Sequence, residues 1–291
     1  MAGHDVDLLI LGGGPAGCAA ARMAASLGLR SLLVEARTLC HRLRSIPAVD
    51  NVLGFSSGPA YADAIAADLV GTPLCTIRTG TRIERLTAAD GTVTAALSDG
   101  SGPTAPYAVV ATGVRPLAPP ETSWITSPPG LPATPLWDAS PDRLRTGPVL
   151  VLGADRPLGT LLRSHPDLDL RLTVLHPAAD DYKADEVRHD PRVTLVRVDE
   201  LFLRHGDGLV RATTSDSTWT AQTLYLNLGN TAAPPAGALN RDATGYCPPG
   251  GQHPRVLVAG DLRSPRGQRI MTATGSGADA ALTAYYRLRF G

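Results

Sequence analysis

The sequence is poor in cysteine and in aromatic residues. Its 291 residues include four cysteines, and aromatic residues make up 4% of the chain. No two cysteines stand close together in the sequence, which excludes a CxxC redox or zinc motif and a disulfide framework. The four are Cys18, Cys40, Cys75 and Cys247. This usage is typical of a reducing cytoplasm, where we expect the protein to be located.

Net charge and long apolar runs are also missing. Lys plus Arg number 27 and Asp plus Glu number 27, so no excess positive charge favours nucleic acid or an anionic membrane as a partner. No apolar run reaches the about 18 residues of a membrane-spanning helix. The run at residues 6–11 follows acidic residues and ends in glycines, so we interpret it as a buried strand and not as a signal peptide.

What the chain does contain is a strand–turn–helix–strand pattern within its first 35 residues. The apolar run 6–11 leads into Gly12-Gly13-Gly14-Pro15-Ala16-Gly17, which fits G-x-G-x-x-G. A helix rich in small residues is expected over 18–27, and a second apolar strand over 31–34 ends in Glu35. In this context the glycines predict a dinucleotide-binding turn.

Each glycine of this motif has a physical task in such a turn. Gly12 permits the sharp bend, Gly14 lets the backbone approach a pyrophosphate, and Gly17 allows the helix to pack closely on the strand. Pro15 and Ala16 begin the helix, whose N-terminus attracts phosphate. Glu35 is placed to accept hydrogen bonds from ribose hydroxyls, and its charge disfavours a 2′-phosphate. The site therefore suits FAD or NAD.

Three later segments decide between these two cofactors. A strand at 107–111 leads into Thr112-Gly113, a strand at 255–259 leads into Gly260-Asp261, and a small-residue helix is expected over 268–282. Together with residues 49–55 (VDNVLGF), these motifs resemble, in order and over the whole chain, the thioredoxin reductase-like branch of the two-dinucleotide-fold flavoproteins. The resemblance implies FAD as the cofactor and suggests a homodimer.

The resemblance also assigns site residues. It implies that Thr112 and Gly113 close the FAD domain, that Asp261 lies at the ribityl or phosphate region, and that Asn51 lies beside the isoalloxazine. The family's Arg-Gln-Ala helix start corresponds to Gln268, Arg269 and Ile270, with the first two residue types exchanged. Arg269 is a candidate cation for the anionic reduced flavin, with a solvated surface arginine as the alternative.

The expected fold is α/β, with two Rossmann-like dinucleotide-binding domains and a discontinuous FAD domain. We place the FAD domain at residues 1–117 and 239–291, and a second domain at 118–238. Residues 116–148 hold nine prolines and are interpreted as the linker between them.

The second domain lacks what a nicotinamide cofactor needs. Its strand at 149–152 leads into Gly153-Ala154-Asp155, where the family has glycine in place of Asp155. A carboxylate there would repel and obstruct a pyrophosphate. The family's His-Arg-Arg cluster is replaced by His176 with Asp180 and Asp181 nearby. We interpret this domain as degenerate, with an unusual NADH site as the alternative.

The family's redox CxxC is absent as well, since no cysteine occurs between Cys75 and Cys247. We therefore expect an FAD-dependent oxidase or dehydrogenase of a small thiol, amine or alcohol, with O2 or another non-nicotinamide acceptor. The alternatives are an NAD(P)H- or ferredoxin-dependent reductase and a catalytically silent flavin-fold partner. His41 is a candidate general base and Cys40 a candidate reactive thiol; an exposed loop histidine and a buried inert cysteine are the competing interpretations. No metal site is predicted.

Overall fold

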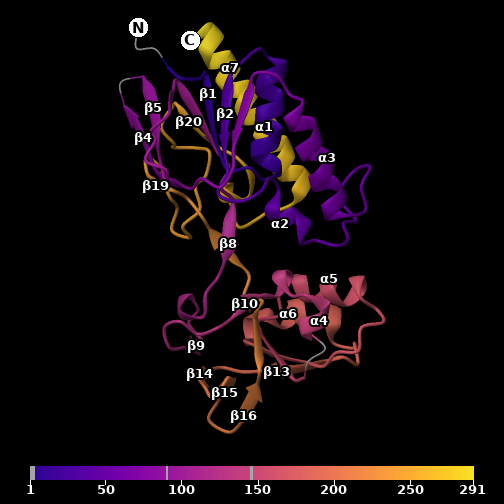
Figure 1. The fold of residues 1–291 in the computed structure, drawn as a ribbon. Helices are drawn as coiled ribbons and strands as arrows, with labels where there is room; N and C mark the ends of the chain where they lie inside the picture. Colours follow the sequence, from indigo (N-terminus) through magenta and orange to yellow (C-terminus); the bar gives the residue numbers. More distant parts are fainter. Residues whose placement is uncertain (1–3, 90, 145–146) are drawn as a thin grey trace. The chain divides into compact units, whose positions relative to one another are not determined.

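The computed structural model describes residues 4–89, 91–144 and 147–291, and the chain divides into two compact units (Figure 1). Unit 1 comprises Met1–Arg115 and Thr231–Gly291, and unit 2 comprises Pro116–Asn230. The sequence placed the inserted domain at 118–238, so the second boundary differs more than the first. In the structure the second boundary comes earlier, at residue 230. There the returning strand β18 (Asn230–Ala232) pairs with β8 (Val114–Pro116), the strand that leads into unit 2.

Unit 1 is built on a five-stranded parallel sheet with the order β20-β7-β1-β2-β3. The strands are β1 (Leu8–Leu11), β2 (Ser31–Val34), β3 (Cys75–Arg78), β7 (Tyr107–Val110) and β20 (Val256–Val258). The central strand β1 is fully buried, as expected of a parallel strand covered on both faces.

Alternate residues of β1 face two different layers. Leu8 and Ile10 pack against three helices, whereas Leu9 and Leu11 pack against a second, four-stranded sheet. The helices are α1 (Pro15–Ser26), α3 (Gly58–Val70) and α7 (Ile270–Phe290). The second sheet has the order β19-β4-β5-β6, with β4 (Ile83–Ala89), β5 (Thr92–Leu97), β6 (Thr104–Ala105) and β19 (Ala236–Gly237).

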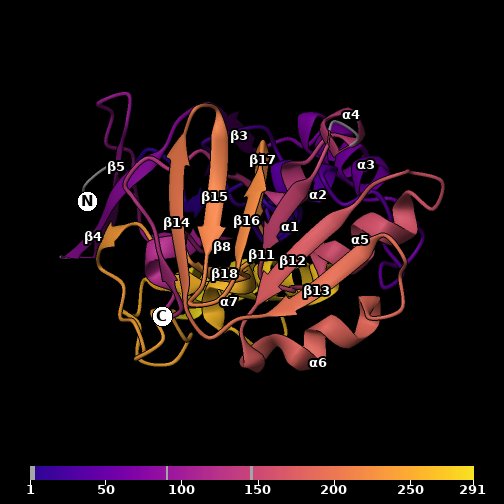
Figure 2. The same ribbon diagram turned by 90° about the horizontal axis from the view of Figure 1, so that it is seen from below.

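Unit 2 repeats this three-layer plan. Its parallel sheet has the order β10-β17-β11-β12-β13, with helices on one face and an antiparallel-rich sheet on the other (Figure 2). The parallel strands are β10 (Thr134–Pro135), β11 (Val149–Leu152), β12 (Leu172–His176), β13 (Val193–Arg197) and β17 (Thr223–Leu226). The helices are α4 (Pro141–Leu144), α5 (Pro157–Ser164) and α6 (Asp181–Ala184). The second sheet contains β9 (Ile125–Thr126), β14 (Leu201–Gly206), β15 (Leu209–Thr213) and β16 (Thr218–Ala221).

The remaining elements are short. Strands β8 (Val114–Pro116) and β18 (Asn230–Ala232) pair in a two-stranded sheet, and α2 (His41–Arg44) follows β2. The described residues also form five 3-10 helices: η1 (Pro119–Glu121), η2 (Leu136–Asp138), η3 (Ala178–Asp180), η4 (Asp185–Val187) and η5 (Gly260–Arg263). The fold class predicted from the sequence, α/β with two Rossmann-like domains, is confirmed.

The described residues of the proline-rich segment 116–148, interpreted from the sequence as the linker between the domains, belong to unit 2. Its described residues contribute β9 to one sheet and β10 to the other, and both are edge strands. Proline has no backbone N–H and cannot donate a hydrogen bond to a neighbouring strand. An edge strand has a neighbour on one side only, so it tolerates proline. Pro135, the proline in β10, therefore fits at the edge of its sheet.

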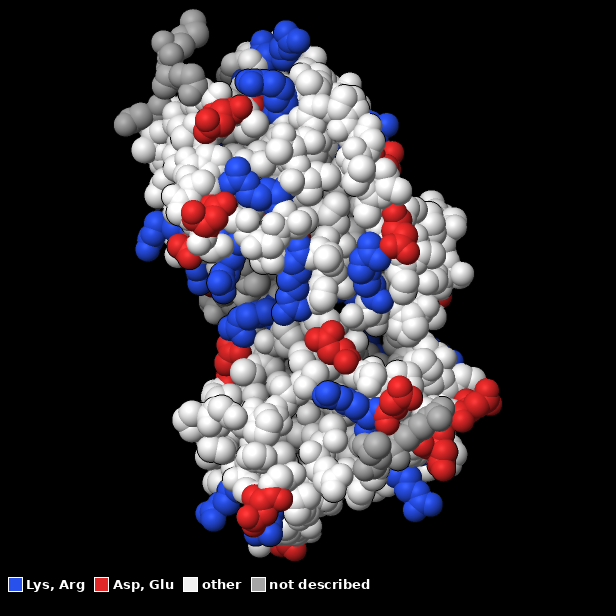
Figure 3. Space-filling model, in the orientation of Figure 1, with Lys and Arg blue, Asp and Glu red and all other residues white. Residues whose placement is uncertain are grey.

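Two surface properties can be read from the described residues. Basic and acidic side chains are intermixed on the face seen in Figure 3, in keeping with their equal numbers in the sequence. None of the helices formed by the described residues has the length and hydrophobicity needed to cross a bilayer.

Helix α7 packs on the start of α1 through Gly277. A Cβ atom on Gly277 would lie 1.9 Å from the carbonyl oxygen of Ala16, whereas a Cβ on Gly275, also in α7, would meet nothing within 4 Å. The two helices approach this closely because Gly277 has no side chain. Their contact holds the start of α1 in place.

This contrast gives a paired prediction. Gly277→Ala should destabilise the protein by about 1–3 kcal/mol, because the added methyl group displaces backbone. Gly275→Ala should leave stability unchanged or raise it by up to about 1 kcal/mol, because alanine favours a helix. Urea unfolding followed by circular dichroism measures both. Equal midpoints for the two variants would contradict the packing described.

Candidate functional site

The glycine turn between β1 and α1 is shaped by two contacts that leave no room for a side chain. Gly12 has φ +107°, and a Cβ there would lie 2.4 Å from the carbonyl oxygen of Ala111. A Cβ on Gly17 would lie 1.8 Å from the carbonyl oxygen of Gly12. Gly14 differs, since a Cβ there would meet nothing within 4 Å. Gly12 and Gly17 thus shape the turn, while Gly14 leaves open space in front of it.

Helix α1 starts directly behind that open space. Gly14 is its N-cap, Pro15 occupies the first turn, and no side chain of the described residues caps this end or places an acid there. Ala16 is buried beneath Gly260 and Gly277. The uncapped N–H groups and the helix dipole favour an anion such as a pyrophosphate at this end.

Glu35 lies at the end of β2 and is bonded to the turn. Its carboxylate accepts a hydrogen bond from the backbone N–H of Gly13 at 2.7 Å and another from the N–H of Arg37 at 2.8 Å. These two bonds fix the carboxylate beside the glycines, where its remaining lone pairs can accept from ribose hydroxyls.

The end of β7 brings a second polar group to the same turn. Ala111 donates its backbone N–H to Leu11 at 2.7 Å, which holds the following Thr112 and Gly113 next to Gly12. The Thr112 hydroxyl is buried and has no hydrogen-bond partner among the described residues. Gly113 has φ +66°. A buried hydroxyl without a partner is costly, which suggests that a bound ligand completes it.

Asp261 follows Gly260 in η5 and is largely buried. Burial raises the pKa of its carboxyl group, although the nearby charges of Arg42 and Arg269 act in the opposite direction. Gly260 has φ +69° and donates its N–H to Ser276 Oγ at 2.8 Å, which attaches this segment to α7. A desolvated carboxylate gains from hydrogen-bond donors, and ribityl hydroxyls are such donors.

The segment before α7 contains Gln268 and Arg269, whose residue types are exchanged relative to the family's helix start. Arg269 is the N-cap residue, is exposed, and donates to the carbonyl oxygen of Gln268 at 2.8 Å. Gln268 turns inward and donates to the Ser264 carbonyl oxygen and the Tyr246 hydroxyl. Ile270 is half-buried and begins the helix. Arg269 is thus an exposed cation at a helix N-terminus, and its role toward a reduced flavin stays a prediction.

Asn51 lies in the loop that joins α2 to α3. It is exposed, and the loop closes on itself through the Val49 N–H, which donates to the Ser56 carbonyl oxygen at 2.9 Å. The structure therefore brings Glu35, Thr112 and Gly260 up to the glycine turn, with Gly113 following Thr112, while Asn51 stands on a separate loop of the same unit.

The two candidate catalytic residues have different surroundings. Cys40 is 2% exposed and donates its N–H to the Gly13 carbonyl oxygen at 2.8 Å, so it lies beneath the turn. His41 is half-buried, and its Nε2 lies 2.7 Å from Nη1 of Arg37. Because a guanidinium can only donate, Nε2 must accept. Acting as a base through Nε2 would require His41 to leave Arg37.

Unit 2 has its own strand–turn–helix segment between β11 and α5. Gly153 has φ +88°, and a Cβ there would lie 2.4 Å from the carbonyl oxygen of Asn227. It thus reproduces the bend at Gly12. Two residues later, where unit 1 has Gly14, stands Asp155. The backbone frame of a dinucleotide turn is kept, but its open position carries a carboxylate.

That carboxylate is paired within the chain. Lys183 Nζ lies 3.7 Å from Asp155 Oδ1 and 3.0 Å from Asp180 Oδ1. Burial disfavours the charge on Lys183, but the hydrogen bond to Asp180 and the charges of both aspartates outweigh it and raise the pKa of this lysine. We call Asp155, Lys183 and Asp180 the aspartate–lysine cluster. It places two carboxylates and their shared cation at this turn.

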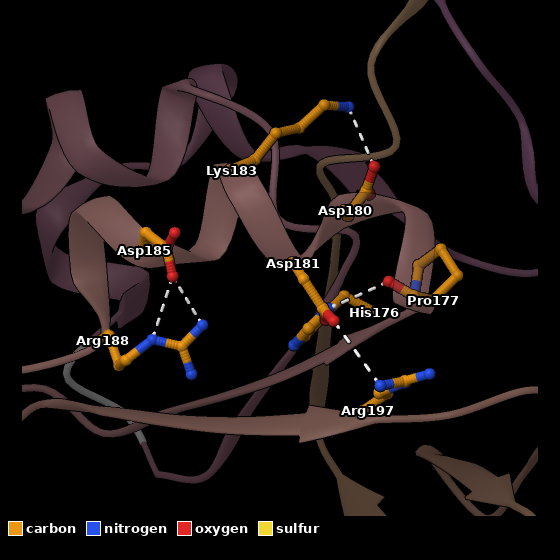
Figure 4. A network of polar contacts seen from close by, with 8 residues as sticks. All are labelled: His176, Pro177, Asp180, Asp181, Lys183, Asp185, Arg188 and Arg197. Carbon is orange, nitrogen blue, oxygen red and sulfur yellow. Dashed lines mark hydrogen bonds and ion pairs between the residues drawn. The ribbon is translucent and has the colours of Figure 1, made fainter.

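Figure 4 shows the neighbouring part of this network. The buried His176 places Nδ1 3.2 Å from the carbonyl oxygen of Pro177 and 3.7 Å from Asp181, which also pairs with Arg197 at 3.5 Å. The residue that would head a phosphate-binding His-Arg-Arg cluster is therefore enclosed and contacts an acid.

Comparison with known proteins places these observations in a family. A family model described as pyridine nucleotide-disulphide oxidoreductase matches residues 6–122, which include the glycine turn, Glu35, Thr112 and Gly113. Residues 6–122 are similar to this family, and the rest of the chain lies outside the match. The resemblance to thioredoxin reductase-like flavoproteins is thereby confirmed, and so is FAD as the cofactor, which proteins of this family bind. No curated protein matches the sequence.

Solved structures share the fold over nearly the whole chain. Thioredoxin reductase from T. acidophilum has a TM-score of 0.78 at 18% identity, covering 99% of this chain and 100% of that one. Thioredoxin reductase from Lactococcus lactis gives 0.79 at 18% identity, covering 97% and 98%. Bacillithiol disulfide reductase from Bacillus cereus gives 0.75 at 14%, covering 97% and 99%. At these identities the likeness concerns the fold.

Two residues near these turns escaped the sequence analysis. Arg42 donates to the carbonyl oxygen of Val114 at 3.1 Å and lowers the pKa of Asp261, although 219 positions separate it from that acid. Lys183 neutralises Asp155 from a helix that begins after the next strand. No sequence motif marks either residue, because each acts only through a contact that the fold creates.

The aspartate–lysine cluster yields a stability prediction. Lys183→Met should destabilise unit 2 by about 1–2 kcal/mol, because two largely buried carboxylates lose their common cation. Arg188→Met is the matched control, since it removes an exposed ion pair with Asp185 and should cost less than about 1 kcal/mol. Urea unfolding at neutral pH measures both, and equal losses would contradict the cluster's role.

Proposed function

We propose that this protein is an FAD-dependent oxidoreductase that oxidises a small organic thiol, amine or alcohol and transfers the electrons to O2 or another non-nicotinamide acceptor. The observation that carries the proposal is Asp155 with its partner Lys183, at the position where a nicotinamide cofactor's pyrophosphate would approach the backbone. A second carboxylate, Asp180, adds to the negative charge there.

The two turns of the chain support opposite roles. In unit 1 Gly14 faces open space, the α1 N-terminus is uncapped, and the Thr112 hydroxyl has no partner among the described residues. In unit 2 the corresponding position bears a paired carboxylate. The residues of unit 1 thus fit FAD, whereas those of unit 2 do not fit a second dinucleotide.

We assign the roles of the unit 1 residues accordingly. The α1 N-terminus and Gly14 would hold the pyrophosphate, Glu35 the adenosine ribose, and Asp261 the ribityl hydroxyls. Arg269 would stabilise negative charge on the reduced ring. Bound FAD supplies the hydride acceptor. His41 would take the substrate proton through Nε2, which first requires the hydrogen bond from Arg37 to break.

The dithiol chemistry of disulfide reductases has no equivalent motif here. The sequence holds no cysteine between Cys75 and Cys247, so residues 131–138 offer no thiol pair. We further propose a homodimer in the cytoplasm, on the resemblance to the family. The alternative is a reductase supplied by NAD(P)H or ferredoxin. The retained bend at Gly153 is an observation on the side of this alternative.

Anaerobic flavin spectroscopy tests the proposal. On addition of NADPH or NADH the flavin absorbance should remain at its oxidised level over minutes, because no nucleotide reaches the flavin by way of unit 2. A thiol, amine or alcohol substrate should bleach it, and readmitted O2 should restore the absorbance. Rapid bleaching by either nicotinamide would instead establish a reductase.

Cofactor binding at Gly14 has a separate test. Gly14→Ala should fold normally, because the added methyl group meets nothing in the chain, yet it should weaken FAD binding at least tenfold by intruding on the pyrophosphate. Gly102→Ala, an exposed position of unit 1 whose Cβ has one contact at 3.8 Å, is the control. Fluorescence titration of the apoproteins with FAD gives the affinities. Equal affinities would place the cofactor elsewhere.

A further inference from the structure

Two cysteines that are 22 positions apart in the sequence meet beneath the glycine turn. Cys18 lies in the first turn of α1 and Cys40 just before α2, and their Sγ atoms are 3.9 Å apart. Both side chains are 2% exposed. The sequence analysis found no close pair because it compared positions along the chain, whereas the fold brings these two together.

Both cysteines are attached to the same carbonyl group. The Cys18 Sγ–H donates to the Gly13 carbonyl oxygen at 3.3 Å, and the Cys40 N–H donates to it at 2.8 Å. The N–H of the same Gly13 donates to Glu35. The pair is therefore held in position by the turn, and its two sulfurs stay neighbours as long as the turn keeps its shape.

The surroundings also offer a route to one of the two sulfurs. A cavity of about 460 Å³ lies between α1, α3 and α7, and Cys18 is among its lining residues together with Ala19, Met23, Tyr61 and Ile65. Apart from the Arg22–Asp68 ion pair the lining is mainly apolar, and a space of this size admits a small uncharged molecule. Hydrogen peroxide and organic hydroperoxides are small and uncharged.

We propose that Cys18 and Cys40 are a site of oxidative modification, at which a peroxide converts the two thiols into an intramolecular disulfide. The Cys18 sulfur attacks the O–O bond, forming a sulfenic acid and releasing water or an alcohol. The Cys40 sulfur then attacks the sulfenic sulfur, forming the S–S bond and releasing water. Two thiols lose two electrons and two protons, and the peroxide gains them. The 3.9 Å separation shortens to about 2.05 Å.

The same surroundings set the rate. The contact with Cys40, burial and the negative charge of Glu35 all raise the pKa of the Cys18 thiol. Since the thiolate is the nucleophile, oxidation in the folded protein is slow, and it needs sustained peroxide. Once a sulfenic acid forms, however, Cys40 is the sulfur in contact with it, so the disulfide is the expected product.

Mass spectrometry of the purified protein tests this inference. The reduced protein is treated with millimolar hydrogen peroxide, quenched, and alkylated in denaturant. The expected result is a form that has lost two alkylation sites and two hydrogens, that yields a linked Cys18–Cys40 peptide after digestion, and that dithiothreitol returns to four free thiols. Four alkylated cysteines after treatment, or a linkage through Cys75, would overturn the inference.

Variants and an unfolded control sharpen the test. Cys18→Ala and Cys40→Ala should each abolish the linked form, whereas Cys247→Ala, buried away from the pair, should retain it. In urea the wild-type chain should give a mixture of linkages among its four cysteines, whereas the folded protein should give the Cys18–Cys40 link, which provides a readout even if a variant does not fold. The same mixture of linkages from the folded protein would show that the fold does not create the site. Each measurement is independent of whether FAD is bound.

Discussion

The structure of unit 1 depends on backbone approaching backbone where β1 ends. The carbonyl oxygen of Ala111 lies where a side chain of Gly12 would begin, and that of Gly12 lies where one of Gly17 would begin. α7 adds a third contact of this kind at Gly277. These approaches fix the start of α1 and leave its N-terminus facing the space in front of Gly14. The helix can then offer its dipole and N–H groups to an anion.

Unit 2 keeps the same turn geometry with a different side chain at its open position. The bend at Gly153 and its contact with the Asn227 carbonyl oxygen repeat the bend at Gly12. The difference is Asp155, whose charge Lys183 balances within the chain. The three-layer frame depends on backbone packing and buried apolar residues, whereas the anion site depends on the side chain at one position. The fold can therefore persist without binding a nucleotide.

The sequence predicted most reliably what is local. The strands at 31–34 and 149–152, the turn at 12–17 and its companion Glu35 were expected where they are found, because hydrophobic runs and glycines act within a few residues. The Pro-rich segment was misjudged, since edge pairing by β9 and β10 depends on strands far along the chain. Lys183 at Asp155 and Cys18 at Cys40 were missed for the same reason.

The most direct test of the account is a crystal structure of the purified protein soaked with NADPH. We predict density for FAD with its pyrophosphate at Gly14 and the α1 N-terminus, and none beside Asp155, where Lys183 keeps its two aspartates. A nicotinamide dinucleotide bound across residues 153–159, or a glycine turn at 12–17 without a flavin nucleotide, would contradict it.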